Sequence, residues 1–186
     1  MKRFFDIFLA IIILPIIFFP CLTIICLIRI SSKGPAIHWS KRIGKDKSYF
    51  FMPKFRTLRV GTPQKATHLL DNQGKYYTPM GKLLRRTSLD ELPQIWSILV
   101  GEMSFVGPRP ALYNQYDLVK LREEKGINSL VPGLTGWAQI NGRDEISVEE
   151  KVALDLVYLK KSSIRLDMII IFNTAIKALK SEEVAH

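Results

Sequence analysis

The sequence predicts a mostly helical α+β protein in which a membrane-embedded helical segment precedes one compact domain. Three observations lead to this prediction: an apolar run near the N-terminus, a pair of short aromatic segments after it, and amphipathic segments with helical spacing towards the C-terminus. At 186 residues, the chain has room for one membrane element and one domain of about 150 residues. We place the boundary between residues 1–30 and residues 31–186.

The apolar run extends from Phe4 to Ile28 and contains one charged residue, Asp6. As a helix rising ~1.5 Å per residue, it would be long enough to cross a hydrocarbon core of ~30 Å. Pro15 and Pro20 interrupt the helical hydrogen-bond ladder, however, and basic residues flank the run on both sides. We therefore expect a helix-break-helix that re-enters the membrane, with both ends on the cytoplasmic face. A membrane-spanning helix and a cleaved signal peptide are the alternatives.

The charge of the chain narrows the class of partner. An excess of 27 Lys and Arg over 17 Asp and Glu gives a net charge of +10, which favours anionic partners such as phospholipids, nucleotide sugars and polyprenyl phosphates. Nucleic acid is not expected, because the sequence has no helix-turn-helix, RNP or zinc-finger pattern. Cys21 and Cys26 lie inside the apolar run and the histidines are scattered, so we expect neither a disulfide nor a histidine-built zinc site.

The segments after the apolar run predict a small β-hairpin followed by helices. Residues 36–39 and 48–58 are apolar or aromatic and are separated by a basic, glycine-containing stretch, as in two strands joined by a turn. Residues 60–80 are polar and predict a loop. Helices are expected over residues 89–99, 147–161 and 165–179. The apolar faces of the last two would pack on a core or lie on the bilayer.

Asp90 and Glu91 form a pair of adjacent carboxylates at the start of the first of these helices. Ser88 and Glu91 have the spacing of a capping box, in which each side chain bonds to the backbone N–H of the other, and this alone would explain Glu91. Asp90, in the first turn, would be kept ionised by the helix dipole, as suits a nucleophile or a Mg²⁺ ligand. Neighbouring helical side chains point ~100° apart, so both would approach one metal ion or one phosphorus atom from different sides.

Several basic residues occupy positions that suit phosphate binding. Pro108 and Pro110 fix the backbone on both sides of Arg109, and Arg143 follows a second glycine-containing loop at residues 132–136. Further candidates are Lys54, Arg56 and Arg85. Solvated surface charge is the commoner explanation for any one of them, so the prediction depends on their converging on the carboxylates.

Seven segments, taken in order, resemble the small monotopic phosphoglycosyl transferases, which are bacterial sugar transferases. They are Lys2–Asp6, the proline-broken apolar run, Lys54–Thr57, Ser88–Gln94, Gly101–Pro110, Pro132–Gly136 and Asn141–Arg143. The resemblance implies an enzyme that moves a phospho-sugar from a UDP-sugar to undecaprenyl phosphate and releases UMP. It also implies the cytoplasmic face of the bacterial inner membrane and the first membrane step in assembling an O-antigen, a capsule or a glycoprotein glycan.

The resemblance further implies roles for single residues. Asp90 would be the nucleophile that forms a covalent phospho-sugar intermediate, with Mg²⁺ bound at Asp90 and Glu91 and with Glu91 as metal partner or base. The phosphates would be bound by Arg85, Arg109 and Arg143, with Lys54 or Arg56 completing the basic rim. Implied partners are the UDP-sugar, undecaprenyl phosphate, the bilayer and downstream glycosyltransferases, while homodimerisation is left open.

The sequence departs from the family pattern at one position, and its net charge has one alternative explanation. The family commonly breaks its leader helix at a Ser-Pro pair, whereas this chain has Phe19-Pro20, so the freed backbone groups need other partners. A basic, membrane-tethered adaptor or nucleic-acid binder would also explain the net charge, and its activity would not depend on Asp90.

Overall fold

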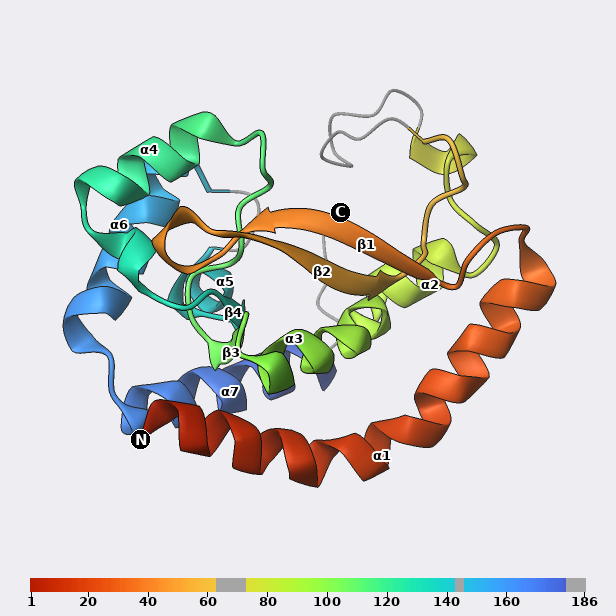
Figure 1. Ribbon diagram of the computed structural model, residues 1–186, viewed down its shortest axis with the longest axis horizontal. Helices are drawn as coiled ribbons and strands as arrows, with labels where there is room; N and C mark the ends of the chain where they lie inside the picture. Colours follow the sequence, from red (N-terminus) through yellow and green to blue (C-terminus); the bar gives the residue numbers. More distant parts are fainter. Residues whose placement is uncertain (63–72, 143–145, 180–186) are drawn as a thin grey trace.

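The computed structural model describes residues 1–62, 73–142 and 146–179, and is mostly helical as predicted (Figure 1). The helices are α1 (Lys2–Ser31), α2 (Gly81–Arg86), α3 (Ile95–Val100), α4 (Tyr116–Glu124), α5 (Trp137–Asn141), α6 (Val148–Lys161) and α7 (Ile164–Leu179). The strands are β1 (Ile37–Ile43), β2 (Tyr49–Phe55), β3 (Ser104–Val106) and β4 (Gly133–Thr135). Short 3₁₀ segments are η1 (Lys45–Lys47), η3 (Gln73–Lys75), η4 (Leu89–Gln94) and η5 (Ile127–Ser129).

The predicted hairpin is confirmed. Strands β1 and β2 are antiparallel, with Ile37 opposite Phe55 and Ile43 opposite Tyr49. Because side chains alternate along a strand, Phe50 and Met52 turn towards the core, while Tyr49 and Phe51 at the start of β2 face solvent. Strand β2 also packs against η4, the segment that carries the two predicted carboxylates.

A second pair of strands was not predicted. Strands β3 and β4 are parallel, with Ser104 opposite Gly133 and Val106 opposite Thr135, so part of the expected loop at residues 132–136 is a strand. The two backbones approach so closely that a Cβ atom on Gly133 would lie 2.1 Å from the backbone nitrogen of Gly107. Glycine is required there because any larger residue would push the strands apart.

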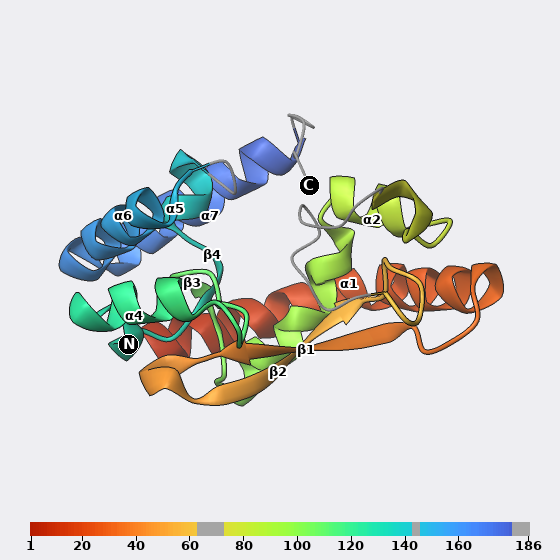
Figure 2. The same cartoon turned by 90° about the horizontal axis from the view of Figure 1, so that it is seen from above.

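Both C-terminal helices lie where they were expected. Helix α6 begins after Ser147, which forms a capping box with Glu150: the Ser147 hydroxyl accepts from the Glu150 N–H, and the Glu150 carboxylate accepts from the Ser147 N–H. Figure 2 shows α6 and α7 together on the side of the molecule away from the hairpin.

Helix α1 is continuous through Pro15 and Pro20, where the sequence predicted a break between two helices. It bends sharply along its length (Figure 1) and contacts the rest of the protein at its two ends. Its buried side chains are Asp6, Ala10, Ile24 and Ile28, so both prolines lie in the exposed middle. Proline removes a hydrogen bond and clashes with the preceding turn, which explains a bend at this place.

The first turn of α1 is fixed by polar contacts. The Asp6 carboxylate is 3% exposed and accepts from the Ser104 hydroxyl at 3.0 Å and the Phe105 N–H at 3.1 Å. The Lys2 ammonium forms an ion pair with Asp167 of α7 at 2.5 Å. The N-terminal end of the apolar helix is therefore joined to the strand that leads into the Arg109 loop.

Replacing Asp6 with alanine is expected to destabilise the protein by about 2 kcal/mol, because two buried donors would lose their acceptor. The measurement is thermal or denaturant unfolding in detergent. The matched control is Asp117→Ala, at an exposed aspartate of α4, which is expected to change stability by less than about 0.5 kcal/mol. Equal effects of the two substitutions would contradict a structural role for the Asp6 contacts.

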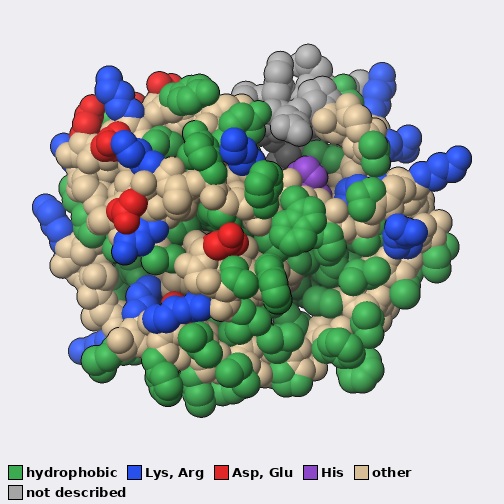
Figure 3. Space-filling model, in the orientation of Figure 1, with side chains coloured by type: hydrophobic (Ala, Val, Ile, Leu, Met, Phe, Trp, Pro, Cys, Tyr) green, Lys and Arg blue, Asp and Glu red, His purple; other side chains and the backbone are tan. Residues whose placement is uncertain are grey.

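Large apolar side chains remain exposed on several helices, among them α1, α3 and α7. Phe19 of α1 is 73% exposed, Trp96 of α3 is 56% exposed and Phe172 of α7 is 66% exposed. Hydrophobic side chains gather along the edge where α1 runs (Figure 3). By length and composition, α1 is also the one helix in the described part of the chain that could cross a membrane. An exposed apolar surface of this kind is typical of a membrane or protein contact.

Candidate active site around Asp90 and Glu91

The segment that carries the two carboxylates is a 3₁₀ helix, and the predicted capping box at its start is absent. Ser88 has a left-handed backbone with φ of 55°, and its side chain makes no capping bond. The Glu91 N–H bonds at 3.2 Å to the backbone carbonyl of Ser88 instead. The α-helix expected over residues 89–99 therefore starts only at Ile95, and the helix-dipole argument for Asp90 loses its basis.

Glu91 turns away from the predicted cap because two cations bind it. Its Oε1 atom accepts from Lys54 Nζ and from Arg109 Nη2, both at 2.7 Å, and its side chain is 17% exposed. Burial would raise the pKa of the Glu91 carboxyl, but the charges of Arg109 and Lys54 outweigh burial and hold the pKa well below its usual range. Glu91 is therefore ionised at neutral pH.

Asp90 lies next to this ion-paired group in a different electrostatic environment. It is 7% exposed, and burial raises the pKa of its carboxyl to about 6. The cations Lys54, Arg85 and Arg109 favour the ionised form, whereas the Glu91 charge disfavours it. Two adjacent carboxyls thus have pKa values displaced in opposite directions, as is common in sites that carry chemistry. At neutral pH, Asp90 is a mostly ionised but unusually basic carboxylate.

The structure brings Lys54, Arg85 and Arg109 to the carboxylates from three different elements. Lys54 comes from β2, Arg109 from the loop after β3, and Arg85 from the end of α2, where its Nε donates to the Thr57 hydroxyl at 2.8 Å. Burial lowers the pKa of the Lys54 ammonium, while the Glu91 charge opposes that change. This convergence was the condition under which the sequence predicted a phosphate site.

Two predicted basic residues are not placed at this cluster. Arg56 is 5% exposed, and its guanidinium donates to the backbone carbonyls of Ser32 and Lys33 and to the Ser32 hydroxyl, so it joins the end of α1 to the end of β2. Arg143 lies outside the described residues.

Sequence reasoning missed two residues of the hairpin. His38 is paired directly with Lys54 in the strand register, and Arg42 follows on the same face of β1. Burial lowers the pKa of the His38 imidazole, and the charges of Arg42, Lys54 and Arg85 lower it further. Both could have been predicted from the alternation of side chains along a strand, which places residues 38, 40 and 42 of β1 on the face that carries Lys54.

The residues present fit one magnesium ion that is bound jointly by protein carboxylates and by substrate phosphates. No group of three or more His, Cys, Asp or Glu side chains able to hold a metal occurs in residues 1–62, 73–142 and 146–179. Mg²⁺ is usually bound through one or two carboxylates together with substrate phosphates and water, so it does not need such a group. Asp90 and Glu91 supply two carboxylates beside the cations.

Comparison with known proteins identifies the family. The model of the family described as "Bacterial sugar transferase" matches residues 1–181, which is nearly the entire chain. The chain belongs to the bacterial sugar transferase family. The matched residues include the apolar helix, the carboxylate pair and the converging cations.

Relatives within the family differ in length. The uncharacterised sugar transferase EpsL of Bacillus subtilis is 37% identical, over 98% of this chain and 89% of its own length. The UDP-glucose:undecaprenyl-phosphate glucose-1-phosphate transferase of Escherichia coli is 40% identical, over 95% of this chain but only 40% of its own length. The exopolysaccharide production protein ExoY of Rhizobium meliloti is 36% identical, over 93% of this chain and 83% of its own length.

Proposed function

We propose that this protein transfers a sugar 1-phosphate from a UDP-sugar to undecaprenyl phosphate and releases UMP. The observation that carries the proposal is the buried Asp90, with its raised pKa, between an ion-paired Glu91 and three cations. The relative from Escherichia coli is named for this reaction with UDP-glucose, and it supports the choice of donor and acceptor classes. The reaction would start a lipid-linked glycan of an exopolysaccharide, capsule or related polymer.

In the first half-reaction, an Asp90 carboxylate oxygen attacks the phosphorus that bears the sugar. The bond between that phosphorus and the bridging oxygen of the diphosphate breaks, and UMP leaves with the electron pair. The product is a covalent aspartyl phospho-sugar. The unusually basic Asp90 carboxylate suits this role, because nucleophilicity rises with basicity as long as the group is ionised.

In the second half-reaction, an oxygen of undecaprenyl phosphate attacks the same phosphorus and the Asp90 carboxylate leaves. Asp90 returns to its starting state, and the sugar now stands on a lipid-linked diphosphate. Because one carboxylate serves both steps, donor and acceptor react in sequence, and UMP is released before the lipid phosphate reacts.

The charges around Asp90 would stabilise the phosphates in both steps. Lys54, Arg85 and Arg109 present cations to a diphosphate, and arginine is suited to binding phosphate through two parallel hydrogen bonds. A Mg²⁺ ion held by Asp90 and Glu91 would neutralise diphosphate charge when bound. Glu91 would hold Lys54 and Arg109 in place before the substrate arrives. We assign Arg143 the same phosphate-binding role by motif position, and Arg56 a supporting role at the end of α1.

We also propose that α1 is re-entrant: it inserts into the inner membrane from the cytoplasmic side and returns to that side. Residues 31–186 would then form the catalytic domain on the cytoplasmic face. Ala10 at one end of α1 packs in a core cluster with Ile98, and Ile28 at the other end packs in a cluster with Phe55. Both ends thus contact one domain, whereas a straight spanning helix would carry its ends to opposite faces. The exposed apolar side chains of α3 and α7 would lie in the interface.

Labelling of single cysteines is expected to place the N-terminus and the domain on the same side of the membrane. In a background with Cys21→Ser and Cys26→Ser, one cysteine is inserted after Met1 and another replaces Lys47, a 48%-exposed residue in the turn of the hairpin. An impermeant maleimide should label both in inverted membrane vesicles and neither in intact spheroplasts. Labelling of the two cysteines from opposite sides would instead establish a spanning helix.

The reaction itself is tested by UMP release from the purified protein in nanodiscs, with Mg²⁺ and undecaprenyl phosphate, across a panel of UDP-sugars. We expect turnover with at least one donor and, without the lipid acceptor, a burst of UMP close to one equivalent per enzyme. Lack of activity across a broad panel with folded protein would favour the membrane-tethered adaptor. Turnover without a burst would retain the transfer and exclude the covalent intermediate.

A further inference from the structure

The loop that carries Arg109 has an unusual set of backbone contacts. The four successive carbonyls of residues 108–111 each accept a hydrogen bond from a different residue outside the loop. The donors are, in order, the Gly133 N–H at 2.9 Å, Arg122 Nη1 at 2.9 Å, Arg42 Nη1 at 3.1 Å and the Ile43 N–H at 3.0 Å. The loop is therefore held from β4, α4 and β1 together, and its two prolines have no N–H to satisfy.

Arg122 makes this contact from a buried position, which requires its charge to be neutralised. It is 5% exposed, and its Nε and Nη2 atoms both donate to Oδ2 of Asp155, at 3.0 and 2.7 Å. Asp155 lies on α6 and is 1% exposed. The planar guanidinium thus uses one side for Asp155 and has Nη1 available for the Arg109 carbonyl, a division that a lysine ammonium does not reproduce.

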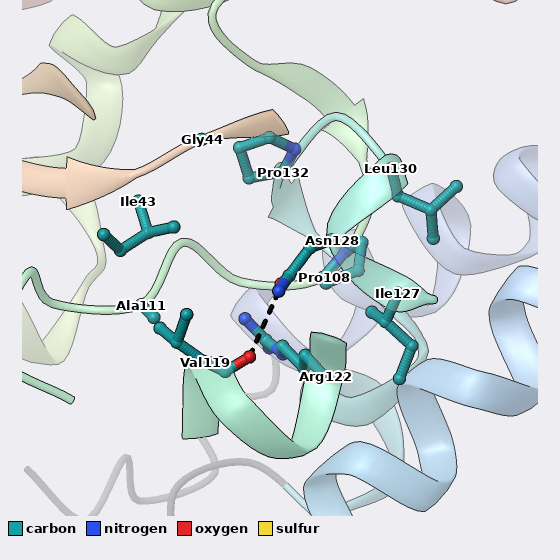
Figure 4. A pocket seen from close by; sticks show the side chains of 10 residues that line it. All are labelled: Ile43, Gly44, Pro108, Ala111, Val119, Arg122, Ile127, Asn128, Leu130 and Pro132. Carbon is teal, nitrogen blue, oxygen red and sulfur yellow. Dashed lines mark hydrogen bonds between the residues drawn. The ribbon is translucent and has the colours of Figure 1, made fainter. Parts of the chain in front are cut away.

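The space behind the loop is too small for a substrate. Arg122 lines a cavity of about 20 Å³ together with Pro108, Pro132 and other residues (Figure 4). Such a volume corresponds to about one water molecule. Arg122 therefore does not bind substrate from this side, and its influence on the carboxylates passes through the backbone of Arg109.

We infer that the buried Arg122–Asp155 pair is a positioning device for Arg109. It fixes the Arg109 carbonyl, and the guanidinium of the same residue then lies at 2.7 Å from Glu91. The Arg109 side chain is 34% exposed, so packing alone does not immobilise it, and the fixed backbone limits the positions that the guanidinium reaches. Displacements of about 1 Å in such groups cost up to about 100-fold in rate. The inference rests on the proposed phosphoryl transfer.

The test is a double-mutant cycle on kcat/KM for UMP release. Replacing the pair by Arg122→Met with Asp155→Leu leaves no unpaired buried charge, and such replacements are often tolerated by the fold. We expect a loss of about 10- to 100-fold in the wild-type background. In an Arg109→Gln background, we expect the same replacement to lower kcat/KM by less than about 3-fold, because the guanidinium that the pair positions is already absent.

Two further variants complete the test. Arg122→Lys keeps the charge beside Asp155, and its smaller structural change gives a second cycle if the double replacement does not fold. The control is Lys47→Gln with Glu123→Gln, which removes an exposed ion pair that also involves α4 and is expected to leave kcat/KM unchanged. Equal losses in the wild-type and Arg109→Gln backgrounds, or no loss in a folded variant, would overturn the inference. A wild-type protein without UMP release contradicts the proposed function instead.

Discussion

Asp90→Asn is expected to lose at least about 10³-fold in UMP release while becoming more stable than the wild type above pH 7. The loss follows from the proposed role of the carboxylate as nucleophile, which an amide does not replace. The gain follows from burial: raising the pKa of Asp90 from 3.8 to about 6 corresponds to about 3 kcal/mol of destabilisation at pH 8, because the folded state holds a charge that it disfavours.

The raised pKa of Asp90 determines the pH range in which the wild type and Asp90→Asn differ in stability. Between about pH 4 and pH 6, the folded wild type binds the Asp90 proton more tightly than the unfolded chain does, so this group lowers stability as the pH rises. Asparagine has no such proton, and the two proteins should converge below about pH 4. Unfolding in Mg²⁺-free buffer across this range measures the difference. Asp117→Asn is the control and should leave both activity and stability unchanged.

These two results separate a catalytic residue from a structural one. If Asp90→Asn lost activity and stability together at pH 8, the simplest explanation would be damage to the site, and the proposed nucleophile would lack support. If it kept activity, the covalent mechanism would be wrong.

The acid side of the pH–rate profile of the wild type is expected to reflect the same carboxyl. In the metal-free protein the pKa of Asp90 is raised to about 6, and a Mg²⁺ ion bound at this carboxyl would lower it. We therefore expect kcat/KM to fall about tenfold per pH unit on the acid side, with a midpoint that moves towards pH 6 as the Mg²⁺ concentration is reduced. The measurement is the initial rate of UMP release between pH 5 and pH 8 at a substrate concentration well below KM. A profile that stays flat down to pH 5 at every Mg²⁺ concentration that supports turnover would show that Asp90 has an ordinary pKa or does not react in its ionised form.

The fold was predictable where local signals were strong. The hairpin has two apolar or aromatic segments around a glycine-containing turn, and α6 and α7 have helical spacing. The pair β3 and β4 escaped prediction because each strand has three residues and depends on a contact between distant glycines. The false capping box has a similar cause: local spacing favoured a bond between Ser88 and Glu91, but two cations from elsewhere in the chain attract the carboxylate more strongly.

The site shows the same division between local and distant determinants. Lys54 and Arg56 are two residues apart and would share a face in a longer strand, but β2 ends at Phe55, so only Lys54 reaches Glu91. Arg122 looks like an ordinary solvated charge on a helix, because its partner Asp155 comes from another helix. Residue type and spacing predicted which side chains suit phosphate chemistry, whereas tertiary contacts decide which of them meet.

Glu91→Gln is expected to lose about 10²-fold or more in UMP release and, unlike Asp90→Asn, to destabilise the protein at pH 8. Arg109 and Lys54 hold the pKa of Glu91 low. The ionised carboxylate therefore stabilises the folded protein at every pH above the ordinary pKa of a glutamate. Removing one partner of a largely buried ion pair costs about 3 kcal/mol. Lys54 would then carry a buried charge that lacks its carboxylate partner, and Arg109 would lose the acceptor that fixes its guanidinium.

The substitution should also move the acid limb of the residual activity to lower pH. The negative charge of Glu91 favours the protonated form of Asp90, so removing it lowers the pKa of the Asp90 carboxyl. Unfolding at pH 8 and the pH–rate profile measure the two effects, with Glu124→Gln at an exposed position of α4 as the control. If Glu91→Gln matched this control in stability, the ion pairs would contribute nothing to the fold. An unchanged acid limb would mean that the two carboxyls titrate independently, and Glu91 would then act through Lys54 and Arg109 alone.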